Sequence, residues 1–200
     1  MTKRWIRERK TDVYHREARR RGYRSRAAFK LIQINEKFGV IKEGDFVVDL
    51  GAAPGGWSQV AQELVRDRGR VVAVDRKRMS PIEGVTILRG DLRKPETLSL
   101  IHERIGKYID VVISDMAPRL SGNRHVDHAR SIALAEIALE FATRILKKGG
   151  NFLAKVLQGD MFSSYLENTS RRFAFCRAHT PKASLSRSRE IFVVAKDFRG

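Results

Sequence analysis

The sequence predicts an α/β fold with a mostly parallel sheet and helices on both of its faces. Short apolar runs of strand length recur along the chain, and segments with helical spacing of apolar residues lie between several of them. Parallel strands covered on both faces consist of nearly continuous apolar residues, and these runs have that composition. Alternation of such strands with helices is typical of a parallel sheet enclosed between two helical layers.

The elements follow in order along the chain. Strands are expected at residues 46–50, 70–75, 85–91, 109–115, 151–157 and 190–196. Helices are expected at residues 26–38, 56–67 and 129–150. In the last of these, Lys147 and Lys148 are expected in the final turn, with Gly149 and Gly150 closing the helix.

The size and composition are those of a single domain over residues 1–200, with a basic N-terminal segment at about 1–26. The one cysteine, Cys176, excludes an internal disulfide and is expected to be a buried thiol in a reducing compartment. No segment has the length and apolar composition of a membrane span or a signal peptide. We therefore expect a soluble, cytoplasmic protein, which we take to be a monomer.

Positive charge is concentrated at the two ends of the chain. The net charge is +17, and residues 1–30 hold twelve lysines and arginines against three acidic residues. Residues 170–200 hold eight against two, whereas the middle of the chain is nearly neutral. Clustered cations gain free energy by displacing counterions from phosphates, so this distribution predicts a polyanionic partner such as RNA.

Aspartates lie at or near the ends of four predicted strands. In an open parallel sheet, ligands bind at the carboxyl ends of the strands, so four carboxylates there are expected to line one cleft. An aspartate can also cap a helix, but four at corresponding positions favour a binding site. They are Asp49, Asp75, Asp91 and Asp115.

The segment "VVDLGAAPGGWSQ" (47–59) joins a predicted strand to a helix through a glycine loop. Such a loop lets backbone approach a ligand, and the helix N-terminus favours electron-rich groups. The spacing matches neither the Walker A loop nor the dinucleotide fingerprint, which disfavours an ATPase or a dehydrogenase. Asp75 ends the next strand, where an acid can bind both hydroxyls of a ribose. Adenosine without a pyrophosphate fits better, and S-adenosyl-L-methionine is the common cofactor of that kind.

Six ordered motifs resemble the FtsJ/RrmJ family of S-adenosylmethionine-dependent ribosomal RNA 2′-O-ribose methyltransferases. The likeness runs from about Tyr23 to Ala195. The motifs are "YRSRAAFKL" (23–31), "VVDLGAAPGGWSQ" (47–59), "GVTILRGDLR" (84–93), "DVVISDMAP" (110–118), "KVLQG" (155–159) and "SRSREIFVVA" (186–195). The resemblance implies a Rossmann-like methyltransferase fold with a seven-stranded, mostly parallel sheet whose last hairpin is antiparallel.

The resemblance also implies two sets of site residues. The catalytic Lys-Asp-Lys-Glu set falls on Lys30, Asp115, Lys155 and Glu190. The cofactor pocket would use Gly55 and Trp57 in the loop, Asp75 for the ribose hydroxyls, Asp91 for the adenine amino group, and Asp115 near the methionine end. No metal is expected.

The chemistry is consistent with these residue types. A ribose hydroxyl is a poor nucleophile, so the protein must align it with the methyl group and remove a proton. Lys155 can be the general base only when it is uncharged, and burial and a neighbouring ammonium such as Lys30 both disfavour the charged form. Asp115 would orient a lysine or the methyl donor, and Glu190 would place the ribose or act on Lys30. Without the resemblance, these side chains could equally lie on solvated faces.

The expected function is 2′-O-methylation of a ribose, most simply a uridine, in large-subunit ribosomal RNA, either free or in the ribosomal subunit. Two alternatives remain open: a transfer RNA 2′-O-methyltransferase with the same four residues, and a non-catalytic RNA-binding module of ribosome assembly.

Three aromatic residues and two histidines have weaker interpretations. Trp5, Tyr14 and Tyr23 could stack on bases or pack a helix against the core. His125 and His128 have the spacing of a metal pair but no third ligand, so the segment 120–128 is expected to be a polar loop that closes over substrate.

Overall fold

A computed structural model describes residues 12–105, 109–185 and 188–200 of the chain. The helices are α2 (Val13–Arg20), α3 (Ala28–Phe38), α4 (Gly56–Val65), α5 (Pro95–Ile105), α6 (Arg124–Ile145) and α7 (Phe162–Ser170), with a short 3-10 turn, η1 (Arg66–Arg68), after α4. The strands are β1 (Phe46–Leu50), β2 (Arg70–Asp75), β3 (Val85–Arg89), β4 (Ile109–Ser114), β5 (Leu146–Leu157), β6 (Phe173–His179) and β7 (Glu190–Phe198).

The seven strands form one sheet in the order β3-β2-β1-β4-β5-β7-β6. The strands from β3 to β5 pair in parallel, while β7 runs antiparallel to both of its neighbours, β5 and β6. The chain order reverses direction at β1, because β2 and β3 lie on one side of it and β4 on the other. The expected seven-stranded, mostly parallel sheet with an antiparallel last hairpin is therefore confirmed.

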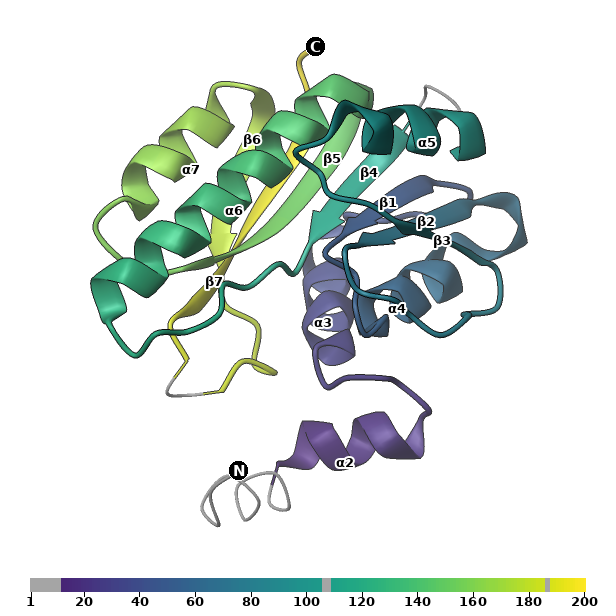
Figure 1. Cartoon of the computed structure of the whole chain (residues 1–200), viewed down its shortest axis with the longest axis horizontal. Coiled ribbons are helices and arrows are strands. Elements are labelled where there is room, and N and C mark those ends of the chain that lie inside the picture. The colour runs from purple at the N-terminus through teal and green to yellow at the C-terminus, as the bar shows by residue number, and fades with distance from the viewer. Residues whose placement is uncertain (1–11, 106–108, 186–187) are drawn as a thin grey trace.

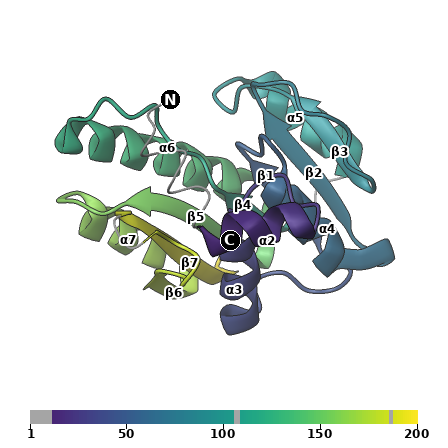
Figure 2. The same cartoon turned by 90° about the horizontal axis from the view of Figure 1, so that it is seen from below.

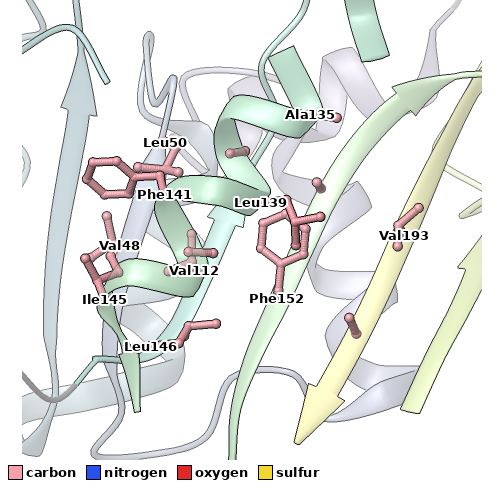
Figure 3. Close-up of a cluster of buried hydrophobic side chains, with 14 of the residues drawn as sticks. Val48, Leu50, Val112, Ala135, Leu139, Phe141, Ile145, Leu146, Phe152 and Val193 are labelled. Atoms are coloured by element: carbon pink, nitrogen blue, oxygen red, sulfur yellow. The ribbon is translucent and has the colours of Figure 1, made fainter. Parts of the chain in front are cut away.

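Helices cover both faces of the sheet, as expected (Figure 1). The face under α5, α6 and α7 is packed with one large apolar cluster, in which Leu139 and Phe141 of α6 meet Val112, Phe152 and other strand residues (Figure 3). The other face packs under α3 and α4 around a second cluster that includes Val47, Trp57 and Phe192. Since successive residues of a strand point to opposite faces, each inner strand contributes to both clusters.

Two sequence-based predictions need correction. Helix α6 ends at Ile145, so the prediction that Lys147 and Lys148 lie in its last turn is wrong. Leu146 is extended (φ −66°, ψ 135°) with a buried side chain, and Lys147 forms an ion pair with Asp110. β5 therefore begins at Leu146 and pairs irregularly with β4 before it becomes regular at residue 151.

The other correction concerns β6, for which no strand was predicted. It lies at the edge of the sheet, and most of its side chains are only half-buried. An edge strand of this kind lacks the continuous apolar run by which the buried strands are identified.

Helices α2 and α3 lie at one end of the sheet (Figures 1 and 2). A third, small apolar cluster joins them through Ala18, Phe29 and Ala183. Asp12 caps α2 by accepting a hydrogen bond from the backbone N–H of His15. No helix in the described part of the chain is long and apolar enough to cross a membrane.

Candidate active site

Three neighbouring strands bring the predicted catalytic residues to one place. Asp115 follows the last residue of β4, Lys155 is near the end of β5, and Glu190 begins the antiparallel β7, so all three lie at the same end of the sheet. Each is two positions from a core residue packed under α3 and α4, and therefore faces that side. These core residues are Ile113, Leu153 and Phe192.

Lys30 reaches the same point from the first turn of α3, and both lysines are largely buried. Lys30 Nζ donates a hydrogen bond to Glu190 Oε2 at 2.6 Å. Lys155 Nζ donates to the backbone oxygen of Asp115 at 2.8 Å, lies 2.7 Å from Asp115 Oδ1, and lies 3.9 Å from Glu190 Oε1. The structure thus assembles all four residues in the order Asp115, Lys155, Glu190, Lys30, which we call the tetrad.

Glu190 is the central carboxylate of the tetrad. Burial by itself raises its pKa, but the charges of Lys30 and Lys155, with hydrogen bonds from Lys30 and Ser188, outweigh burial and lower the pKa below its usual value. Glu190 is therefore an anion that lies between two cations. A lysine of the tetrad can accept a proton only after it has lost its own, because an ammonium donates hydrogen bonds but cannot accept a proton.

The glycine loop after β1 approaches its neighbours closely. Gly51 and Gly55 have φ values of 71° and 113°, which favour glycine. A Cβ atom at Gly51 would lie 2.2 Å from Met116 Cγ, and one at Gly55 would lie 2.6 Å from Ile82 Cδ1. The loop leads into the first turn of α4, whose N–H groups have no acceptor within the helix. Such N–H groups are suited to a ligand's oxygen atoms.

Asp75 and Asp91, the other two carboxylates predicted for the cofactor pocket, have different hydrogen-bond partners. Asp75 Oδ2 accepts a hydrogen bond from the Ala53 N–H at 3.0 Å, and Oδ1 accepts one from the Lys77 N–H at 2.7 Å. These bonds orient the carboxylate, and each oxygen keeps acceptor capacity for a ligand hydroxyl. Asp91 lies two residues beyond the end of β3 and forms a two-pronged ion pair with Arg93, which lowers its pKa. A ligand amino group would have to share Asp91 with Arg93.

The side chain of Trp57, one of the residues predicted for the cofactor pocket, packs into the core. Its side chain is buried in the cluster under α3 and α4, 5.8 Å from the ring of Phe192. The indole nitrogen donates to the backbone oxygen of Ala27 at 2.8 Å. The ring therefore fixes α4 against the start of α3, and the part of Trp57 that belongs to the first turn of α4 is its backbone N–H.

Arg24 is a residue for which the sequence suggested no role. Its guanidinium donates to the backbone oxygens of Pro54 in the glycine loop (3.2 Å), Ser80 (2.7 Å) and Pro81 (2.5 Å). Its backbone N–H donates to Gln59 of α4. Arg24 thus joins the glycine loop to the loop between β2 and β3, beside Asp75. The only signal in the sequence was its place in the motif "YRSRAAFKL".

The two histidines are not placed as a metal pair. Both ring nitrogens of His128 are already engaged, Nδ1 with the backbone oxygen of Leu157 at 2.8 Å and Nε2 with the N–H of Met161 at 3.0 Å. His125 is exposed and lies near Asp160. The prediction of a polar loop over residues 120–128 is wrong for residues 124–128, because α6 begins at Arg124. The shorter loop before α6 is held by Asp127 of that helix, which accepts hydrogen bonds from the N–H and hydroxyl of Ser121. His128 therefore links the start of α6 to the end of β5 and to the segment that follows β5.

The N-terminal aromatic residues that the structure describes pack inward. The rings of Tyr14 and Tyr23 lie 5.4 and 5.8 Å from that of Phe29, while Trp5 lies outside the described residues. Arg26 forms an ion pair with Asp12 and also donates to the backbone oxygen of Ala183, which ties α2 to the segment before β7. Packing therefore holds the exposed arginines of α2 against α3, the helix that carries Lys30.

The fold and this site define a methyltransferase of the Rossmann-like class. Residues 23–198 match the family of FtsJ-like methyltransferases, and the chain belongs to that family. The matched range includes all six motifs on which the resemblance was based.

Several curated relatives are similar over most of their length. Ribosomal RNA large subunit methyltransferase E of Methanothrix thermoacetophila is 55% identical over 185 residues, which are 92% of this chain and 72% of the relative. The protein of the same name from Methanocella arvoryzae is 52% identical over 189 residues, or 94% and 73% of the two chains. That of Methanococcus maripaludis is 46% identical over 200 residues, or 99% and 78%.

Solved structures agree with the fold. A crystal structure described as a ribosomal RNA methyltransferase from Plasmodium falciparum superposes with a TM-score of 0.82 at 30% identity, over 89% of this chain and 100% of that chain. A second, described as an rRNA methylase from Clostridium thermocellum, gives a TM-score of 0.55 at 17% identity over 84% and 97%, and supports the fold alone.

Proposed function

We propose that this chain transfers a methyl group from S-adenosylmethionine to a ribose 2′-hydroxyl of large-subunit ribosomal RNA. The observation that carries the proposal is the tetrad, in which Lys155 Nζ is buried and held by Asp115 beside the Lys30–Glu190 ion pair. Three relatives are named ribosomal RNA large subunit methyltransferase E, and these names support large-subunit ribosomal RNA as the substrate. The clustered positive charge of the chain ends supports an RNA partner.

The residues beside the glycine loop fit the proposed methyl donor. Asp75 ends β2 and Asp115 follows β4, with β1 between those strands, so the two residues lie two strand spacings apart, about 10 Å along the backbone positions of the sheet. That separation suits a ligand whose ribose hydroxyls bind Asp75 and whose cationic end lies near Asp115. Asp49 lies on β1 between them, and no group in the described part of the chain forms a hydrogen bond with its buried Oδ1.

Lys155 acts on the hydroxyl in the proposed reaction. When bound, S-adenosylmethionine supplies an activated methyl group on a sulfonium centre. Uncharged Lys155 accepts the 2′-hydroxyl proton at Nζ while the new O–C bond forms, the S–C bond breaks, and its electron pair stays on sulfur. Asp115 holds Lys155 in position through its backbone oxygen and its Oδ1. The Lys30–Glu190 ion pair borders Lys155 on its other side and positions the ribose.

Methyl transfer from labelled S-adenosylmethionine tests the proposal. We expect label in large-subunit ribosomal RNA or in the large subunit, in dinucleotides that resist alkaline hydrolysis, because a methylated 2′-oxygen cannot attack the neighbouring phosphate. Lys155→Ala should lower transfer by about 10²–10⁴-fold and still bind the methyl donor. Lys148→Ala, at an exposed position at the other end of β5, is the matched control with unchanged transfer.

Other results overturn parts of the proposal. Alkali-labile label would place the methyl group on a base, transfer RNA as the preferred acceptor would reassign the substrate, and full activity of Lys155→Ala would remove that lysine from the reaction. RNA binding without any transfer would favour the non-catalytic module.

A further inference from the structure

Asp49 is a buried carboxyl group that the proposed reaction does not use. It lies on β1, is fully buried, and pairs with Ala73 of β2 and Ile113 of β4 in the sheet. Its Oδ2 accepts a hydrogen bond from the Ser58 hydroxyl of α4 at 2.6 Å. Among the described residues, its Oδ1 has no hydrogen-bond partner. A buried carboxylate with one unsatisfied oxygen is unfavourable, so this position favours the protonated form.

The groups around Asp49 strengthen that preference. From β2 and β4 the charged groups acting on it are carboxylates, Asp75 and Asp115, and from α4 the facing group is the neutral hydroxyl of Ser58. Burial raises the pKa of Asp49 most, the Ser58 hydrogen bond lowers it, and the two carboxylates raise it, which brings the pKa to about 7. In the described part of the chain, no lysine or arginine forms an ion pair with Asp49. A cation placed between Asp75 and Asp115 would therefore act on a carboxyl that has no other counter-ion.

We propose that Asp49 is a proton-linked sensor of ligand charge, which loses its proton when a cationic methyl donor binds and regains one when the ligand becomes neutral. This inference rests on the proposed function, because it takes the ligand to be S-adenosylmethionine. The product, S-adenosylhomocysteine, has lost the sulfonium charge, so it leaves Asp49 in its protonated form. Asp49 is a specificity-determining residue in this scheme because its ionised form attracts the donor more strongly than the product.

The protons balance over one cycle. Asp49 gives a proton to solvent as the donor binds. Methyl transfer releases one proton from the ribose hydroxyl, which Lys155 accepts and passes to solvent. Asp49 then takes a proton back from solvent after the positive charge has left the site. No proton moves directly from the ribose to Asp49, so Asp49 acts on affinity and the reaction itself can continue without it.

Calorimetric titration in buffers of different ionisation enthalpy measures the proton release directly, without reference to activity. Because burial raises the pKa of Asp49 toward neutral pH, the free protein holds this proton in part of its molecules, and S-adenosylmethionine should release a fraction of a proton. S-adenosylhomocysteine should release clearly less. Sinefungin, which carries an ammonium in place of the methylated sulfur, should behave like the donor. This comparison of three ligands needs only the unaltered protein.

Two variants assign the effect to Asp49. Asp49→Asn should abolish the difference in proton release between donor and product and should reduce the preference for the donor at pH 8. Ser58→Ala removes the hydrogen bond that stabilises the ionised form, so it should move the pH of maximal release upward. For each variant, the affinity for S-adenosylmethionine is compared with the affinity of the same variant for S-adenosylhomocysteine.

Each failure has a distinct meaning. Equal release with donor, product and sinefungin overturns the inference, as does an unchanged release in a folded Asp49→Asn protein. If Asp49→Asn does not fold, the three-ligand comparison in the unaltered protein decides alone. Absence of any binding of S-adenosylmethionine to the unaltered protein would instead overturn the proposed function.

Discussion

Lys30 and Glu190 form an ion pair that joins α3 to the start of β7, with Nζ 2.6 Å from Oε2 across 160 positions of the chain. The other oxygen of Glu190 lies 3.9 Å from Lys155 Nζ. One carboxylate therefore faces both lysines, and each lysine is less than one-tenth exposed. Removing either member of the pair leaves a charge in a place from which water is largely excluded.

We expect Lys30→Met and Glu190→Gln each to lower the free energy of unfolding by about 3 kcal/mol, because each leaves a largely buried charge without its nearest partner. The double variant should lose less than the sum, with a coupling energy of about 1–3 kcal/mol. Urea unfolding of the four proteins measures this cycle. Additive losses would show that the pair contributes no stability of its own, and methyl transfer by the folded variants then reports its part in placing the ribose.

The members of the tetrad could be predicted from the sequence, but their contacts could not. The motifs supplied Lys30, Asp115, Lys155 and Glu190, and we expected Lys30 to act as the ammonium beside Lys155. The structure places Glu190 between the two lysines instead. That arrangement depends on the antiparallel register of β5 and β7, in which Leu157 pairs with Glu190, and a register between distant strands is not readable from spacing.

Arg24 allows a test of the cofactor loop that is separate from the tetrad. Arg24→Ala should raise the dissociation constant for S-adenosylmethionine about tenfold, because the glycine loop loses the guanidinium that joins it to Ser80 and Pro81. Arg24→Lys keeps the charge, but an ammonium cannot donate to several acceptors in one plane as a guanidinium does. This variant should therefore bind S-adenosylmethionine nearly as weakly as Arg24→Ala. Calorimetry gives the affinities.

The matched control for this prediction is Arg20→Ala. Arg20 is exposed on α2 and pairs with Glu17, so its loss should leave the affinity for the methyl donor unchanged. Equal effects of Arg24→Ala and Arg20→Ala would mean that the change is electrostatic and long-range. Recovery of full affinity in Arg24→Lys would show that charge alone is required at this position.

Trp57→Phe distinguishes the two roles of the loop tryptophan. The substitution removes the hydrogen bond from the indole to the oxygen of Ala27 and keeps an aromatic ring against Phe192. We expect a loss of about 0.5–1.5 kcal/mol in the free energy of unfolding, because one buried hydrogen bond is lost while the Ala27 oxygen still accepts from the backbone N–H of Lys30. The affinity for the methyl donor should stay within about twofold. The reverse result, normal stability with weak binding, would place the ring in the cofactor pocket.

The fold was readable where strands are buried on both faces. Strands β1, β2 and β4 consist of almost continuous apolar residues, and their predicted bounds agree closely with the structure. The end of α6 could not be predicted, because the helical pattern of the sequence continues beyond Ile145. In the structure the next residues belong to β5, where Leu146 is buried and Lys147 forms an ion pair with Asp110. Competition between a local helix and a tertiary contact is decided outside the segment itself.

The basic surface near the tetrad predicts a salt-dependent interaction with RNA. Arg19 and Arg20 lie in the last turn of α2, at the end of the sheet where the tetrad assembles (Figures 1 and 2). Reversing both charges should weaken RNA binding and lower the slope of log affinity against log salt by roughly 0.7–0.9 for each phosphate that the protein no longer neutralises. The affinity for the methyl donor should be unchanged.

Lys148→Glu gives the control for these reversals. Lys148 is exposed in the irregular first part of β5, at the opposite end of that strand from Lys155. If RNA binds at the tetrad end, this variant keeps the slope of the unaltered protein in a filter-binding titration from low to high salt, because Lys148 neutralises no phosphate there. If Lys148→Glu reduced the slope as much as the α2 reversals, the protein would be responding to net charge alone, and α2 would have no place in the RNA interface.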